Sequence, residues 1–158
     1  MTQPPRTPRE VFHALVHGVA DRRFDDVVGL YAEQTHVVHP FDPLRAPALR
    51  TRDDLRAHFQ PAATGAPKVR RQPANITVHD TTDPEVIVAE FDYQATVVDT
   101  GEPFNYPCIF VVRVRDGQIV ASRDYVDHLG SARALGQLDQ LVAAVKATST
   151  APTDPPGR

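Results

Sequence analysis

The 158-residue sequence has no tryptophan, one methionine and one cysteine, Cys108. A single cysteine excludes an internal disulfide framework and fits a reducing compartment, so we expect a cytoplasmic protein. A basic excess is missing too, because the formal net charge is −3, and nucleic-acid binding therefore has no support. Apolar runs are too short to span a membrane, and no signal segment opens the chain. We expect no membrane partner.

Hydrophobic residues make up 41% of the chain and charged residues 23%, which is ordinary for a globular protein. The length is that of one domain with a substantial core. The prolines cluster near both ends and between residues 40 and 73. We therefore expect a flexible tail over 1–6, one domain over 7–147 and a disordered tail over 148–158.

The most informative stretch is 104–128, where two apolar runs flank Asp116-Gly117, a dipeptide typical of tight hairpin turns. Alternation predicts one inward face for each strand. On the first strand this face comprises Phe104, Tyr106, Cys108, Phe110, Val112 and Val114. On the return strand it comprises Val120, Ser122, Asp124, Val126 and His128. The second set places a carboxylate and an imidazole where core side chains are expected.

Elsewhere, apolar periodicity and capping signals predict helices that alternate with strands. The expected helices cover residues 8–22, 24–31, 51–61 (ended by Pro61) and 131–147. Further strands are expected at 35–39, 68–79 and 85–98. This order predicts an α+β fold in which helices cover one face of a curved sheet and leave a conical cavity for a ligand.

Four motifs resemble the nuclear-transport-factor-2-like superfamily, and within it the SnoaL-like group related to polyketide cyclases and ketosteroid isomerases. They are LYAEQTHVVHP, TRDDLRAHF, VRVRDGQIV and RDYVDH. The resemblance implies a curved antiparallel sheet of mixed strand order wrapped around N-terminal helices, a cystatin-like α+β barrel with a conical cavity. It also implies a homodimer formed through the outer sheet face, where we expect Ile109, Val111 and Ile119.

The resemblance to ketosteroid isomerase fails at the residues that perform that reaction. Its proton-shuttling aspartate corresponds to His39, and its two hydrogen-bond donors correspond to Leu15 and Phe110, which have no proton to donate. The second-helix tyrosine is kept as Tyr31. Steroid isomerisation is therefore not the expected reaction.

We instead expect His39 and Asp124 to form a catalytic proton-transfer pair, because an imidazole and a carboxylate within hydrogen-bond reach can remove a proton or activate water. The expected ligand-binding residues are Tyr31, Phe91, Tyr93, Tyr106, Phe110, Val126 and His128. Two alternatives stay open. His39 can instead order the proline loop, and Asp124 can pair with Arg113 or Arg123; a one-residue slip would turn Tyr125 and Asp127 inward in its place.

No glycine-rich phosphate loop is present, and the pair His13 and His17 has no accompanying ligand, so we expect neither a cofactor nor a metal. The expected function is isomerisation, cyclisation or hydration of a small apolar metabolite that carries oxygen. The alternatives are a non-catalytic binding protein for such a metabolite and a dimeric assembly module.

Overall fold

The computed structural model describes residues 4–65 and 68–148. Its helices are α1 (Pro8–Ala20), α2 (Phe24–Gly29), α3 (Arg52–Thr64), α4 (His128–Ala134) and α5 (Leu138–Thr148). Its strands are β1 (Tyr31–Val38), β2 (Leu49–Thr51), β3 (Val69–Asp80), β4 (Val86–Val97), β5 (Pro103–Arg115) and β6 (Gln118–Val126). No helix in the described ranges is both long and apolar enough to cross a membrane.

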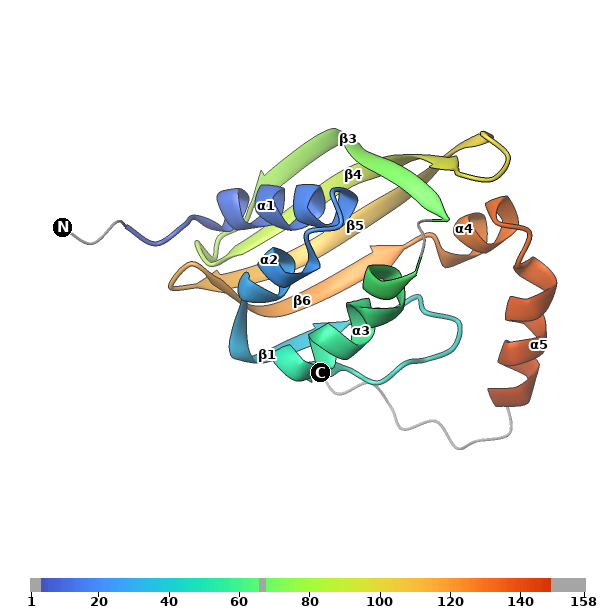
Figure 1. Cartoon of the computed structure of the whole chain (residues 1–158). Helices are drawn as coiled ribbons and strands as arrows, with labels where there is room; N and C mark the ends of the chain where they lie inside the picture. Colours follow the sequence, from blue (N-terminus) through green and yellow to red (C-terminus); the bar gives the residue numbers. More distant parts are fainter. Residues whose placement is uncertain (1–3, 66–67, 149–158) are drawn as a thin grey trace.

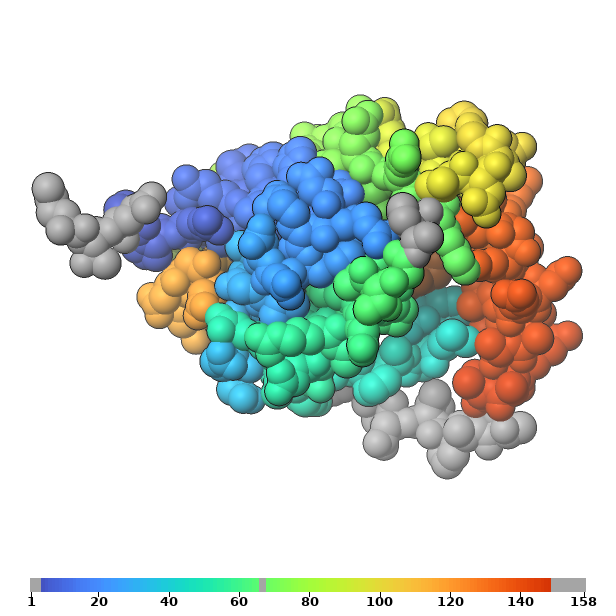
Figure 2. All heavy atoms as spheres, in the orientation of Figure 1, coloured from blue at the N-terminus to red at the C-terminus, as the bar shows by residue number. Residues whose placement is uncertain are grey.

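The six strands form one open sheet in the order β2-β1-β6-β5-β4-β3. All neighbours are antiparallel except β1 and β6, which run parallel. Helices α1, α2 and α3 cover one face of the curved sheet (Figure 1), and the space-filling view shows them as a continuous layer (Figure 2). The α+β class and the curved sheet around N-terminal helices are confirmed.

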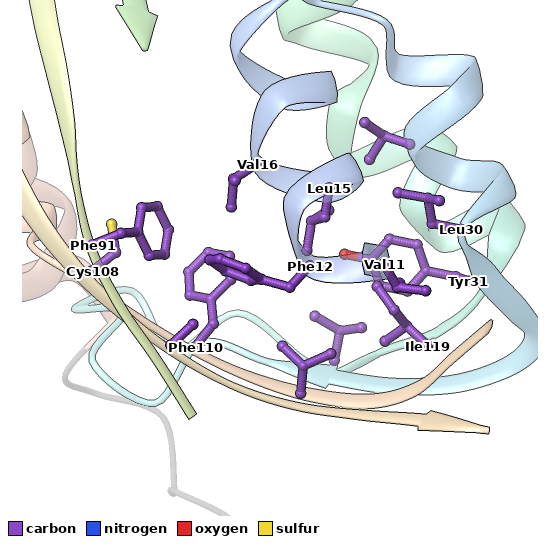
Figure 3. Packing of buried hydrophobic residues seen from close by; sticks show 14 of the residues in the cluster. Val11, Phe12, Leu15, Val16, Leu30, Tyr31, Phe91, Cys108, Phe110 and Ile119 are labelled. Carbon is purple, nitrogen blue, oxygen red and sulfur yellow. The ribbon is translucent and has the colours of Figure 1, made fainter. Parts of the chain in front are cut away.

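The core lies between this helical layer and the inner face of β4 and β5. Phe12 on α1 packs edge-on against Phe91, with ring centroids 5.4 Å apart, and against Phe110 at 6.4 Å (Figure 3). Phe91 and Phe110 themselves meet edge-on at 5.0 Å. Their positions alternate with exposed residues along each strand, as the sequence predicts. These three rings fill the middle of the curved sheet.

Two capping boxes set the starts of the long helices that cover the core. The Thr7 side chain accepts from Glu10 N and the Glu10 carboxylate accepts from Thr7 N; Thr51 and Asp54 repeat the arrangement at α3. The end expected for α3 is wrong, because the helix continues through Pro61 to Thr64. Proline at position 61 leaves the Ala57 carbonyl without its helical N–H donor, but Ala57 is exposed, so water can bind that carbonyl and the last turn still forms.

A β-bulge changes the expected faces of the hairpin. Arg113 pairs with Ala121 and Val114 with Ile119, so Val120 is an additional residue on β6. Ile119, expected on the outer face, is fully buried, whereas Val120 is only half-buried. Beyond the bulge Ser122 and Asp124 face inward as predicted.

Other boundaries also differ from the expectations. Tyr31 begins β1 rather than ending a helix, and the C-terminal helix is divided at Gly136, whose φ of +67° ends α4 and separates it from α5. Thr148 belongs to α5, and the rest of the expected tail, 149–158, lies outside the described residues, as do residues 1–3. Residues 5–6 lie against the hairpin turn, where a Cβ on Gly117 would come within 3.1 Å of the Arg6 nitrogen.

Candidate active site

Asp124 lies two residues before the C-terminal end of β6 and is 6% exposed. Its register partner is Phe110 on β5, one of the rings that fill the core. Its Oδ1 accepts a hydrogen bond from the hydroxyl of Ser122, which is 1% exposed. The inner, mainly apolar face of the sheet therefore carries a buried, hydrogen-bonded carboxyl group.

His39 reaches Asp124 because β1 runs beside β6. Val38, the last residue of β1, pairs with Arg123, so His39, the next residue of the chain, comes to the level of Asp124. The distance from His39 Nε2 to Asp124 Oδ2 is 3.9 Å, which is longer than a hydrogen bond. The His39 side chain is 19% exposed and therefore links the buried carboxyl to the surface.

Two further imidazoles surround His39. The ring of His58 on α3 stacks on it, with centroids 5.3 Å apart and planes 19° apart. His128 begins α4, and its Nε2 is buried without a hydrogen-bond partner in the described parts of the chain. A buried imidazole nitrogen without a partner is costly unless another group, such as a ligand, completes it.

Burial controls the protonation of this group. It raises the pKa of Asp124 to about 7, and the hydrogen bond from Ser122 opposes that rise. It lowers the pKa of His39 to about 4, and the neighbouring His58 and His128 lower it further, whereas Asp42 raises it. Neighbouring atoms also shield the ring of His58 from water and lower its pKa, although the residue as a whole is exposed. Near neutral pH, His39 is uncharged and Asp124 is divided between its acid and its carboxylate.

The predicted ligand-binding residues all lie on the inner side of the molecule. Tyr31 is 2% exposed, and burial followed by the charge of Asp124 raises its pKa well above the ordinary value. Tyr93 donates a 3.4 Å hydrogen bond to the Val16 carbonyl. Tyr106 accepts one from Arg71. Apart from His128, whose place at the start of α4 is given above, the remaining members are apolar and pack in or against the core: Phe91, Phe110 and Val126.

The alternatives for Asp124 were an ion pair with Arg113 or Arg123 and a one-residue slip that would turn Asp127 inward, and the contacts of these residues bear on both. Arg113 forms ion pairs with Asp83 and Glu85, and Arg123 lies over the Tyr125 ring. Asp127 is engaged elsewhere, because its Oδ1 accepts a hydrogen bond from Gly130 N and caps α4. The register therefore turns Asp124 inward, and no arginine in the described ranges forms an ion pair with it.

His58 is the member of the group that the sequence analysis missed. It lies three residues after Leu55, which is 1% exposed, and this spacing places both on one face of α3. That periodicity is the signal that could have found it, but it does not show that the imidazole meets His39 rather than a purely apolar surface.

Two hollows lie away from His39 and Asp124. One, of about 680 Å³, is bounded by residues of β3, β4 and β5. The other, of about 510 Å³, lies among the N-terminal segment, α1 and α2. In residues 4–65 and 68–148, no group of three or more His, Cys, Asp or Glu residues could hold a metal ion.

Comparisons with known proteins place this geometry in a family. Among solved structures, a proposed isomerase from Bacillus subtilis is 22% identical with a TM-score of 0.72, over 82% of this chain and 92% of that one. A proposed polyketide cyclase from Pseudomonas putida KT2440 is 14% identical with a TM-score of 0.65, over 82% and 98%. A Catenulispora acidiphila protein with a ketosteroid isomerase-like fold, solved with trimethylamine, is 15% identical with a TM-score of 0.64, over 83% and 95%. These likenesses show the fold.

At the level of sequence, the uncharacterized protein YesE of Bacillus subtilis (strain 168) is 38% identical over 60 residues. That alignment spans 38% of this chain and 41% of the relative, so the chain matches less than half of the relative's length. The model of the SnoaL-like domain matches residues 12–122, which include most of α1, all of α2 and α3, strands β1 to β5 and the first half of β6. This chain belongs to the SnoaL-like domain family.

Proposed function

We propose that this chain is an enzyme that moves a proton on a small, apolar, oxygen-bearing molecule and so isomerises, cyclises or hydrates it. The observation that carries the proposal is the buried Asp124 carboxyl, whose pKa is raised to about 7 and whose Oδ2 lies 3.9 Å from His39. A general base works best when its pKa is near the working pH. The relatives described as a proposed isomerase and a proposed polyketide cyclase support this class of reaction.

In the proposed reaction the Asp124 carboxylate removes a proton from a carbon beside a carbonyl group. The electron pair of the broken C–H bond forms a C=C bond, and the carbonyl oxygen becomes an enolate oxygen. In isomerisation, the protonated Asp124 returns the proton to another carbon. In cyclisation, the enolate carbon bonds to a second carbonyl carbon, whose oxygen takes the proton. In hydration, the water oxygen bonds to a carbon of a C=C bond conjugated with the carbonyl while Asp124 takes a proton from the water, and the resulting enolate takes that proton back at the carbon beside the carbonyl.

His39 and His128 are the proposed hydrogen-bonding groups for the substrate oxygen. A neutral imidazole has one N–H donor, and a donor in a dry site stabilises a developing oxyanion more than it would in water. Burial keeps His39 neutral at the pH where Asp124 ionises. The stacked His58 ring holds the plane of His39. These residues replace the donors that Leu15 and Phe110 cannot supply.

Deuterium exchange into 2-tetralone, followed by proton NMR in D₂O, tests the proton-transfer step without knowledge of the natural substrate. We expect exchange at the carbon beside the carbonyl to be faster with the protein than in buffer. Asp124→Asn should remove roughly a hundredfold or more of this acceleration, because it removes the base. His39→Gln should remove a smaller part. The matched control is Asp139→Asn, at an exposed aspartate of α5.

Equal acceleration in wild type and Asp124→Asn would contradict the proposal. Absence of exchange in the wild type favours the second candidate, a non-catalytic binding or assembly protein. The packing of Phe12, Phe91 and Phe110 supports that candidate, because side chains of the protein itself occupy the middle of the curved sheet. Saturation-transfer NMR with 2-tetralone then separates its two forms: a signal indicates a binding protein, and none indicates an assembly module.

We further propose a homodimer formed through the outer sheet face. Ile109 is 41% exposed there, and its register partner Tyr125 and the neighbouring Val111 extend the apolar surface. Apolar surface of this kind is the usual core of an interface between subunits. Sedimentation at micromolar concentration should show a dimer for the wild type and a monomer for Ile109→Glu. A wild-type monomer would overturn this assignment.

A further inference from the structure

Arg71 is a cation on the aromatic inner side of the sheet. It pairs in register with Ala95, which is 5% exposed and faces the core. Its guanidinium lies 5.6 Å from the centre of the Tyr93 ring and 5.9 Å from that of Tyr106. Its Nη1 donates a 2.7 Å hydrogen bond to the Tyr106 hydroxyl. Two rings and one hydrogen bond thus hold the guanidinium in a defined orientation.

This guanidinium has no acidic partner among the described residues. Six other arginines form ion pairs with Asp or Glu: Arg9, Arg23, Arg52, Arg56, Arg113 and Arg115. A guanidinium carries five N–H donors, and the Tyr106 hydroxyl engages one of its nitrogens. Arg71 therefore keeps donors, and a full positive charge, for a group from outside the chain.

The same residue borders an open hollow of about 680 Å³. Three consecutive register rows across β3, β4 and β5 line it, comprising residues 70–72, 94–96 and 103–105. No carboxylate lines it, and of the three rows only the middle one, which comprises Arg71, Ala95 and Phe104, faces the inner side of the sheet. Its charge and size therefore fit a small anion attached to a larger body.

We propose that Arg71 binds the anionic group of a small organic anion, a carboxylate or a phosphate monoester attached to a flat apolar body. The guanidinium fork matches the paired oxygens of either group, and fixed geometry reduces the entropy lost on binding. Phe104, which lines the hollow and stacks on the Tyr106 ring with centroids 5.7 Å apart, offers a ring surface for the apolar body. This site goes beyond the proton-transfer function and does not depend on it.

Isothermal titration calorimetry with three probes tests the site: 2-naphthoate, 2-naphthyl phosphate and the uncharged 2-naphthamide. We expect one or both anions to bind the wild type, and whichever binds more tightly identifies the preferred group. Arg71→Gln should weaken anion binding at least roughly tenfold, because it removes hydrogen bonds from a charged donor. 2-Naphthamide should bind the wild type more weakly than the anions by a similar factor.

Arg50→Gln is the matched control, since it removes the same charge from an exposed position of β2, at the opposite edge of the sheet from the hollow. It should leave the affinity within about twofold of wild type. Equal affinity of Arg71→Gln and wild type, equal weakening by both variants, or equal affinity for 2-naphthamide would each overturn the proposal, as would no binding of either anion at millimolar concentration.

Two further variants keep the test decisive. Arg71→Lys retains the charge and the aliphatic stem but lacks the planar fork, so it should fold like wild type and still bind more weakly. Asp124→Asn should bind the anions as wild type does while losing tetralone exchange. The anion site and the proton-transfer proposal can therefore fail separately.

Discussion

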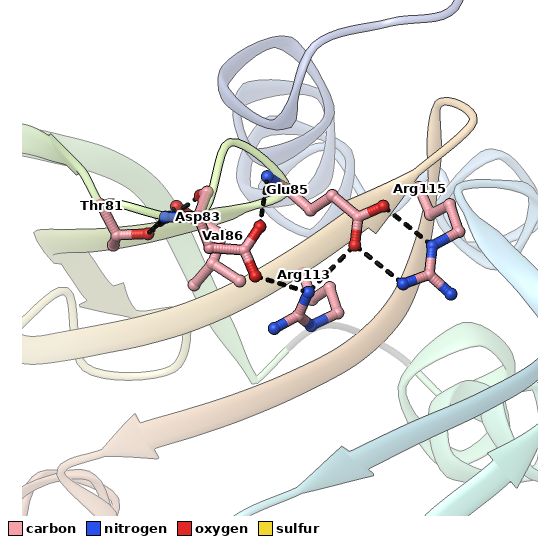
Figure 4. A network of polar contacts seen from close by, with 6 residues as sticks. All are labelled: Thr81, Asp83, Glu85, Val86, Arg113 and Arg115. Atoms are coloured by element: carbon pink, nitrogen blue, oxygen red, sulfur yellow. Dashed lines mark hydrogen bonds and ion pairs between the residues drawn. The ribbon is translucent and has the colours of Figure 1, made fainter.

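Two clusters of acidic and basic side chains on the same sheet behave in opposite ways. Beside the start of β4, Glu85 accepts hydrogen bonds of 2.8 and 2.9 Å from Arg115 and one of 2.9 Å from Arg113, which also reaches Asp83 (Figure 4). These arginines lower the pKa of Glu85 to about 2. On the inner face, burial raises the pKa of Asp124 to about 7.

The difference comes from partners and water rather than from the type of residue. Glu85 is 31% exposed and has two cationic partners, so its charged form is stabilised. Asp124 has a serine hydroxyl and a neutral imidazole nearby, and little water, so its charged form is disfavoured. The first arrangement suits structure, since its protonation is constant over physiological pH. The second suits proton transfer, since it gains and loses a proton near pH 7.

The largest expected change in the free energy of unfolding comes from Asp124→Asn, which removes the disfavoured buried charge. The folded pKa near 7 lies above the ordinary 3.8, so between these values the folded chain holds a proton that the unfolded chain has lost. Asp124 therefore lowers stability as pH rises from about 4 to 7, by on the order of 4 kcal/mol in total. We expect the variant to be more stable than wild type at pH 8, by up to that amount, and nearly equal to it at pH 3 to 4.

Urea unfolding of both proteins across this pH range measures the difference, with Asp139→Asn as the control at an exposed aspartate. A variant that is less stable than wild type at pH 8 would show that the Asp124 carboxylate has an attractive partner in the folded state. Both carboxylates, Asp124 and Glu85, would then be stabilised in their charged forms, and the contrast between them would disappear.

The next largest effect is expected from His39→Gln, and here the folding stability of the wild type falls as pH decreases, the opposite of the dependence expected for Asp124. The folded pKa near 4 lies below the ordinary 6.5, so the unfolded chain binds the additional proton between these values, and stability is lost as pH falls through that window. Wild type should lose on the order of 3 kcal/mol more than the variant between pH 7 and pH 4. Urea unfolding checks this, and His17→Gln, at an exposed histidine of α1, is the control. Parallel losses in wild type and His39→Gln would contradict the buried, neutral imidazole.

Local patterns were sufficient for most of the sheet. The Asp116-Gly117 turn and the alternation on β4 and β5 predicted the faces that the structure shows. The alternation failed to predict the inward face of β6 at the bulge, where the strand contains one additional residue. The bulge at Val120 exchanges it with Ile119 on the inner face, although both are β-branched and equally suited to a strand.

The site was harder to predict because its members are distant in sequence. His39 and Asp124 meet through the parallel pairing of β1 with β6, a contact across 85 positions that periodicity does not encode. Asp124 and His39 were found because polar residues stood in apolar patterns or matched a motif of the resemblance. Arg71 had no such signal, and the spacing of His58 from Leu55 does not show that its ring meets His39.

The smallest effect is expected from Glu85→Gln, which tests the paired side of the comparison. The variant loses favourable contacts with Arg113 and Arg115, and its midpoint of thermal unfolding should fall slightly at low salt. The loss should vanish at high salt, because mobile ions screen partly exposed charges. Protonation should reproduce it in the wild type as pH falls from 4.5 towards 2. Calorimetric scans at low and high salt separate the two clusters: the change for Asp124→Asn, which arises from burial, should persist at high salt, and a salt-independent loss for Glu85→Gln would contradict the distinction.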